Sequence, residues 1–217
     1  MNPDAYYTRG EVSNSDLTAL KNLLHPNLQF GDKEAAFRFG SLVDAMITES
    51  DRVNYYRCTV DDVQYSEEEF EHAMKLHKAL YAEANNDHFL AHVLTFGLTQ
   101  KVSIRNDQKF EYCGFPFSLD TRCKWDWWLK DAGFGGDLKT TFASTEREFH
   151  DAVDFFDWDR SRAWYMDIVG SDRDFIYAVS KKNAKVFKHF IRRGDDVYRR
   201  GRKKYEELAF QYWTLMR

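Results

Sequence analysis

The chain has 217 residues, 43% hydrophobic and 17% aromatic, and a formal net charge of −4. This length is enough for one sizeable core without a second domain, and the charge argues against indiscriminate binding to nucleic acid. An apolar run of membrane length and a charged-then-apolar leader are both missing from the sequence, which predicts a cytoplasmic protein with no membrane partner. The three cysteines are too few for a disulfide framework or a four-thiolate metal site.

The first 97 residues predict a mainly helical part. Ser13 can cap a helix that carries leucines at helical spacing, and a second helix is predicted over about 33–49. Ser66 and Glu69 form a capping box for a long helical region, which residues 85–87 break into two helices.

From Thr99 the apolar period changes to two, which predicts strands. KVSIRN and KFEYCGF read as a hairpin with its turn at residues 106–108, and FSLDTRCKWDWW and GFGGDLKTTF as further strands. Two helices follow from a capping box at Thr145, then two strands and a helix from about Asp195. This order predicts a single α/β domain over 1–217, with a central mixed β-sheet flanked by helices. Residues 1–97 would form its mainly helical part, and 98–217 its sheet core and C-terminal helix.

The segment FPFSLDTRCKWDWWLKDAGFGGDLKTT places an acid on each of two short strands, and a lysine two residues after the second acid. Asp137 and Lys139 project on the same side of their strand because side chains alternate between faces. If the strands pair, Asp120 can lie beside them. Two carboxylates and an ammonium at one point suit metal-assisted phosphodiester cleavage. The same spacing also fits a hairpin with an exposed acid and a solvated lysine.

Taken together and in order, several weak motifs resemble the PD-(D/E)xK nuclease superfamily. The resemblance is to the phage-type exonuclease branch, which includes RecE (exodeoxyribonuclease VIII) and is similar to lambda exonuclease. It covers most of the chain. The motifs are Ser13, Ser15 and Leu17 followed by Pro26; FGSLVD with Gly40 and Asp44; Gly114 and FSLDTR followed by GDLKTT; Ala163, Tyr165 and Asp167; and the terminal strand pair with Gly201 and Tyr205.

The resemblance implies a restriction-endonuclease-like core and a site that uses Mg²⁺ or Mn²⁺. Asp120 and Asp137 would be metal ligands, the backbone carbonyl of Leu138 a further ligand, and Lys139 the catalytic lysine. Where relatives often carry a metal-binding histidine, this chain has Asp44. A carboxylate is an equally good ligand for these ions, so Asp44 joins the expected metal set.

The resemblance also implies contacts to DNA from the helix that carries Tyr165. Relatives tend to have glutamine four residues before that tyrosine, and here the position is Ser161, flanked by Arg160 and Arg162. A serine can make one hydrogen bond to DNA, and the two arginines, together with Arg122, can contact phosphate.

The expected function is a divalent-metal-dependent deoxyribonuclease, most simply an exonuclease acting on double-stranded DNA ends in phage-type recombination or repair. By resemblance, a ring-like homo-oligomer and a single-strand annealing partner would accompany it. The alternative is a non-catalytic DNA-binding or assembly protein that keeps the nuclease fold, and the departures at Asp44 and Ser161 motivate it.

Overall fold

A mixed five-stranded sheet forms the centre of the computed structural model, which describes residues 6–26 and 32–216. The strands lie in the order β4 (Leu98–Tyr112), β5 (Phe115–Leu129), β6 (Phe134–Thr141), β7 (Arg173–Ser180) and β8 (Val186–Arg192). Neighbouring strands are antiparallel except β6 and β7, which are parallel. The predicted α/β class with a central mixed sheet in one domain is confirmed.

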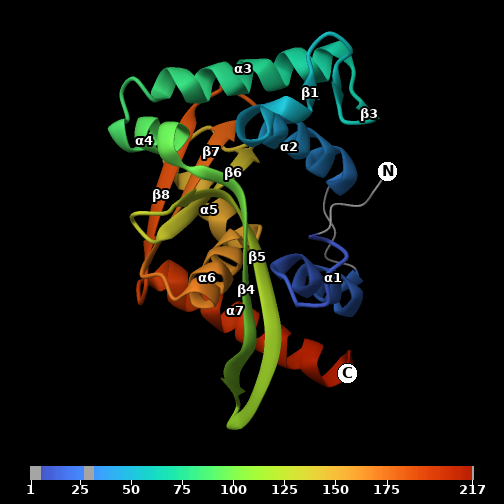
Figure 1. The fold of residues 1–217 in the computed structure, drawn as a ribbon, viewed down its shortest axis with the longest axis vertical. Coiled ribbons are helices and arrows are strands. Elements are labelled where there is room, and N and C mark those ends of the chain that lie inside the picture. The colour runs from blue at the N-terminus through green and yellow to red at the C-terminus, as the bar shows by residue number, and fades with distance from the viewer. Residues whose placement is uncertain (1–5, 27–31, 217) are drawn as a thin grey trace.

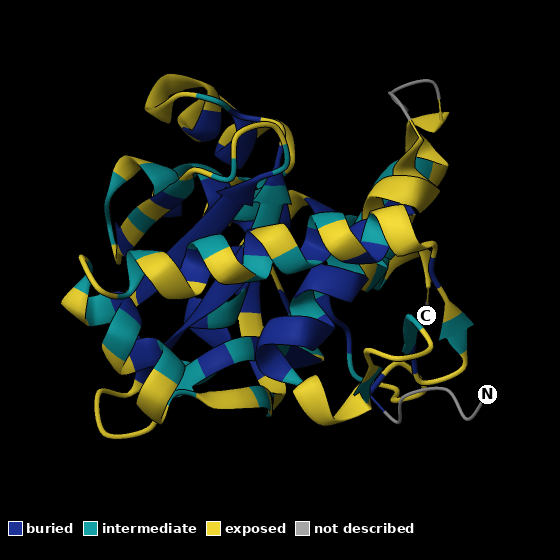
Figure 2. Ribbon diagram, turned by 90° about the horizontal axis from the view of Figure 1, so that it is seen from above, coloured by how far each residue is buried: buried dark blue, intermediate teal, exposed yellow. Residues whose placement is uncertain are grey.

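Helices cover both faces of this sheet (Figure 1). One face carries α2 (Lys33–Thr48), α3 (Glu67–Glu83) and α4 (His88–Phe96). The other carries α1 (Asn14–Leu24), α5 (Glu146–Phe155), α6 (Trp158–Val169) and α7 (Asp196–Leu215). Between α2 and α3 lie a 3₁₀ turn, Ser50–Arg52, and a small antiparallel sheet of β1 (Val53–Asn54), β2 (Thr59–Val60) and β3 (Val63–Gln64). Figure 2 shows the buried sheet between helices whose outer sides are exposed.

Local signals in the sequence fix most of the helix ends. The side chain of Ser13 accepts from the backbone of Asp16, and Ser66 and Glu69 form the reciprocal capping box predicted for α3. The predicted break also occurs, since α3 ends at Glu83 and the carboxylate of Asp87 caps α4. Within the described residues, none of the helices is both long enough and apolar enough to cross a membrane.

The hairpin predicted at residues 106–108 is wrong. The chain passes through this point as one strand, β4, with a bulge between Arg105 and Gln108, and it reverses at Cys113 and Gly114. Those two residues have φ of 51° and 81°, the left-handed conformation that a tight two-residue hairpin turn needs. The resulting long β4–β5 arm packs on α7, where the ring centroids of Tyr112 and Phe210 lie 5.2 Å apart.

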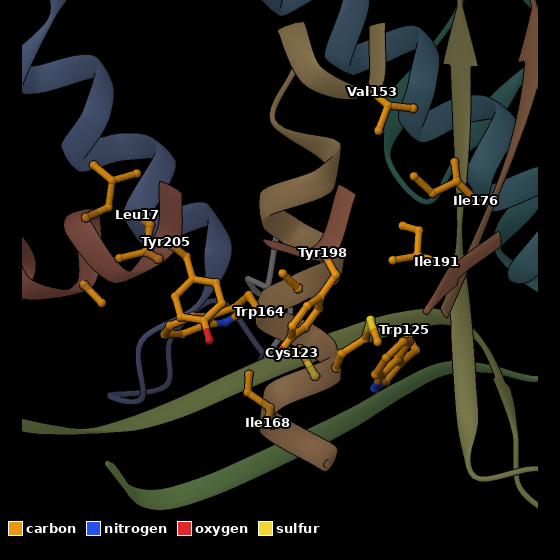
Figure 3. Packing of buried hydrophobic residues seen from close by; sticks show 14 of the residues in the cluster. Leu17, Cys123, Trp125, Val153, Trp164, Ile168, Ile176, Ile191, Tyr198 and Tyr205 are labelled. Carbon is orange, nitrogen blue, oxygen red and sulfur yellow. The ribbon is translucent and has the colours of Figure 1, made fainter. Parts of the chain in front are cut away.

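The core between the sheet and α1, α5, α6 and α7 is rich in aromatic residues (Figure 3). Gly201 lets α7 approach α6 closely, because a Cβ there would lie 2.1 Å from the backbone oxygen of Asp159. One turn on, the hydroxyl of Tyr205 donates to the carboxylate of Asp167, which also accepts from Tyr198 at 2.8 Å. The motif residues Asp167, Gly201 and Tyr205 therefore join two helices.

Candidate active site

The site lies where β5 and β6 separate. These strands pair only from Trp127, opposite Gly136, to Leu129, opposite Phe134. The next step in this register brings Asp126 beside Asp137, at the point where the ladder ends. The backbone amide of Leu138 spans the opening and donates to Oδ2 of Asp126 over 2.7 Å.

Asp137 and Lys139 share one side of β6, as the alternation of the strand predicts. The Lys139 ammonium forms an ion pair with Oδ2 of Asp137 and lies 3.4 Å from the carbonyl oxygen of Leu138. Burial lowers the pKa of Lys139, but the charges of Asp137 and Asp126 outweigh burial and raise it. Lys139 is therefore a protonated ammonium at neutral pH, with 29% of its side chain exposed.

Asp44 reaches the same place from α2. Its carboxylate receives hydrogen bonds from Thr48 Oγ1 at 3.1 Å and from Gln100 Nε2 at 3.3 Å. Gln100 lies at the start of β4 with φ of 54°, so a left-handed backbone aims its amide at Asp44. Burial raises the pKa of Asp44, while Thr48 and the charge of Lys139 oppose the rise.

The three carboxylates act on one another. Burial raises the pKa of Asp126 well above its ordinary value, and the charges of Asp44 and Asp137 add to the rise. Burial also acts to raise the pKa of Asp137, but Arg162 and Lys139 more than offset it and the pKa is lowered. Arg162 and Lys139 thus favour the charged form of Asp137, whereas burial and the two neighbouring acids disfavour the charged form of Asp126.

The donor set fits a hard divalent cation. Three carboxylates and the carbonyl of Leu138 are all oxygen donors, the type that Mg²⁺ and Mn²⁺ prefer, and their mutual repulsion is what a cation would relieve. Among residues 6–26 and 32–216, no group of three or more acids, histidines or cysteines is already gathered as a metal cage. Each carboxylate instead contacts donors of the protein. Asp44 accepts from Gln100 and Thr48, and Asp126 accepts from the backbone amide of Leu138. Asp137 pairs with Lys139 and Arg162.

The structure does not bring Asp120 to this site. Asp120 lies six residues before Asp126 on the same strand, a separation of about 20 Å. It is exposed, and its Oδ1 accepts from the backbone amide of Asp107 at the bulge of β4. Asp126 takes the place expected for Asp120. The signal that could have found it is the tight β5–β6 connection, because counting back from residues 130–133 places Asp126 opposite Asp137.

Two arginines expected to contact DNA are buried instead. The Arg122 side chain is 3% exposed and lies 3.3 Å from Asp16. Arg160 is 2% exposed and donates to Asn14 over 3.0 Å and to Thr18 over 2.5 Å. Both guanidiniums hold the N-terminal segment against the body, and this burial contradicts the expected phosphate contacts.

Ser161, Arg162 and Tyr165 lie beneath the site. The hydroxyl of Ser161 donates to the carbonyl of Trp158 and accepts from Nε of Arg162. Arg162 is 1% exposed, lies 3.3 Å from Asp137 and stacks at 4.0 Å on the ring of Tyr165. Ser161 and Arg162 are buried, so neither side chain is accessible to DNA, whereas Tyr165 is partly exposed.

A mixed α/β sheet with two acids at an opening between strands, and a lysine two residues after the second acid, defines a PD-(D/E)xK-type nuclease fold. Residues 11–217 match the profile of a family described as a PDDEXK-like domain of unknown function (DUF3799), and the chain belongs to that family. Membership supports a nuclease-type hydrolase and confirms the resemblance to the PD-(D/E)xK superfamily found in the sequence.

Two of the solved structures to which the chain is similar are exonucleases. A phage-related exonuclease from Haemophilus somnus 129PT is 13% identical, with 94% of this chain and 93% of that chain covered, at a TM-score of 0.38. An alkaline exonuclease from Laribacter hongkongensis is 11% identical, with 63% and 70% covered, at a TM-score of 0.27. A comparison with curated proteins finds no significant match.

Proposed function

We propose that the protein is a divalent-metal-dependent deoxyribonuclease that degrades double-stranded DNA from its ends, in phage-type recombination or repair. The observation that supports this most is the meeting of Asp44, Asp126 and Asp137 with Lys139 at the opening between β5 and β6. Asp44, Asp126, Asp137 and the carbonyl of Leu138 would hold one or two Mg²⁺ or Mn²⁺ ions. A bound ion lowers the pKa of its water and neutralises charge on the phosphate.

The protein's own groups have distinct tasks in this proposal. Asp137, whose pKa Arg162 and Lys139 lower, would bind the ion as a carboxylate, and the charge of a bound ion would favour the carboxylate form of Asp126 against the effect of burial. Gln100 and Thr48 orient Asp44. Lys139, protonated and partly exposed, donates hydrogen bonds to the attacking water or to the phosphate oxygen on which charge develops.

The test compares end-labelled duplex DNA, single-stranded DNA and RNA as substrates, each with Mg²⁺ or with a chelator. Duplex DNA should shorten from its ends with Mg²⁺ and stay intact with the chelator, and covalently closed circular duplex should survive. Cleavage of the closed circle would contradict the exonuclease mode, and cleavage of RNA alone would contradict the substrate. Intact DNA together with salt-sensitive DNA binding would favour the non-catalytic DNA-binding protein.

A ring-like oligomer and a single-strand annealing partner stay predictions. A monomer found by light scattering at micromolar protein concentration would count against the ring.

Lys181, a lysine outside the expected DNA-binding set, can contact the DNA backbone in place of the buried arginines. The backbone amide of Lys181 donates to Thr141, two residues after Lys139 on β6, over 2.7 Å. Its ammonium lies 4.8 Å from the ring of Phe142, which is 62% exposed, and 5.1 Å from that of Phe39. Among the described residues, no carboxylate forms an ion pair with Lys181. Its partial burial lowers the pKa of its ammonium. Thr141 follows Lys139 by two residues on β6, about 7 Å along the strand, so the hydrogen bond to Thr141 places the backbone of Lys181 at the end of the strand that carries Lys139.

Lys181→Ala should raise KM for duplex DNA about 3- to 10-fold with little change in kcat, and should lower the salt slope of binding by about one. The matched control is Lys185→Ala, because that lysine lies on the same connection but pairs with Glu146 at 3.2 Å. A KM and salt slope equal in the two variants and the wild type would remove Lys181 from the DNA path.

A further inference from the structure

Three buried ionisable groups form a chain that leads from β7 through α6 to the active site. Nη1 of Arg162 lies 3.7 Å from Oδ2 of Asp174, and Nη2 lies 3.3 Å from Oδ1 of Asp137. Their side chains are 0%, 1% and 6% exposed in the order Asp174, Arg162, Asp137. Taking such charges out of water costs several kcal/mol per ion by general estimates, so stability alone does not explain the set.

The guanidinium of Arg162 is held on several sides. Its carbon stacks 4.0 Å above the ring of Tyr165, and its Nε donates to Ser161 Oγ over 3.3 Å. Both carboxylate oxygens of Asp174 lack a well-formed hydrogen bond among the described residues, so Arg162 is the charge that compensates Asp174. These contacts fix both the plane and the depth of the guanidinium.

The two oxygens of Asp137 consequently meet different cations. Oδ1 faces Arg162, which is almost fully buried, while Oδ2 pairs with Lys139, which is partly exposed. A lysine on a flexible stem can leave its partner, whereas a stacked and paired guanidinium stays in place.

We propose that Arg162 is a positioning residue, held by Asp174, that fixes Oδ1 of Asp137 and so reserves Oδ2 for the divalent cation of the proposed nuclease. The inference rests on the proposed function. The charge of Arg162 and its position predict opposite effects on the affinity for the cation. If only the charge of Arg162 mattered, removing it would tighten cation binding, because a positive group beside the ligand would be lost. If position matters, removing it weakens binding, as loss of an outer partner of a metal ligand typically does.

The test is the double variant Arg162→Gln/Asp174→Asn, which removes both partners and leaves no unpaired charge from this pair. Titration with Mn²⁺ by calorimetry, without DNA, should give a Kd about 10- to 100-fold above the wild-type value. The control is Arg160→Gln, a buried arginine two residues earlier on α6 whose partner Asp157 keeps Lys21 and Lys204. Its Mn²⁺ Kd should equal that of the wild type.

A Mn²⁺ Kd in the double variant that is unchanged or lower would overturn the positioning role. If thermal unfolding shows that the double variant does not fold, Arg162→Lys replaces it, since one ammonium cannot span Asp137 and Asp174 as the fork does. That variant should also bind Mn²⁺ more weakly, and an unchanged Kd there overturns the inference as well. Absence of Mn²⁺ binding in the wild type would instead contradict the proposed function.

Discussion

Asp126→Asn should abolish Mg²⁺-dependent degradation of duplex DNA, whereas Asp120→Asn should leave it unchanged. Asp126 lies next to Asp137 at the end of the β5–β6 ladder, and its pKa responds to Asp44 and Asp137. The loss should be about 10³-fold in rate, equivalent to about 4 kcal/mol of transition-state stabilisation, because an amide cannot supply the charge that a ligand of the cation needs. The Asp120 side chain is exposed and accepts a hydrogen bond from the backbone amide of Asp107 at the bulge of β4.

The measurement is the initial rate of release of labelled nucleotide from duplex ends, with thermal unfolding to show that both variants are folded. Asp126→Asn should unfold at a temperature no lower than the wild type, since it removes a half-buried acid beside two others. Equal loss of activity in Asp120→Asn and Asp126→Asn, or loss in Asp120→Asn alone, would contradict the site as the structure builds it.

Features that depend on a few neighbouring residues could be predicted from the sequence. The caps at Ser13 and Ser66, the break before Asp87 and the shared side of Asp137 and Lys139 all follow from local hydrogen bonding and strand alternation. The proximity of Asp44 came only from the resemblance, because nothing local to α2 shows what its carboxylate faces.

The choice between Asp120 and Asp126 depends on strand register. The two residues are six apart, an even number, so the alternation of β5 puts both on the same side and cannot separate them. What separates them is the length of the β5–β6 connection and the point where pairing stops, at Trp127. The hairpin predicted too early, at residues 106–108, hid this register by shortening the expected strands.

The burial of the arginines depends on partners that are remote in the chain. Arg160 pairs with Asn14 and Thr18, more than 140 residues earlier, and Arg162 with Asp174 across a helix–strand contact. Arginine is usually exposed, so two arginines that flank Ser161, four residues before a tyrosine, indicate a surface that could contact phosphate. The packing of α1 and of β7 against α6 shows that these arginines are buried instead.

Lys139→Ala should separate binding of the cation from catalysis. The ammonium of Lys139 occupies Oδ2 of Asp137, so its removal frees a charged ligand oxygen and removes a nearby positive charge. Mn²⁺ binding by calorimetry should therefore stay at least as tight as in the wild type. DNA degradation should fall about 10²- to 10³-fold, the size of effect seen when one donor to a developing oxyanion is removed.

Lys139→Arg is the matched control, because it restores a positive charge at this position on a longer side chain with a planar head group. This variant should recover part of the rate. A Lys139→Ala protein that degrades DNA at the wild-type rate would remove Lys139 from the chemistry, and one that no longer binds Mn²⁺ would make it a structural support of Asp137 instead.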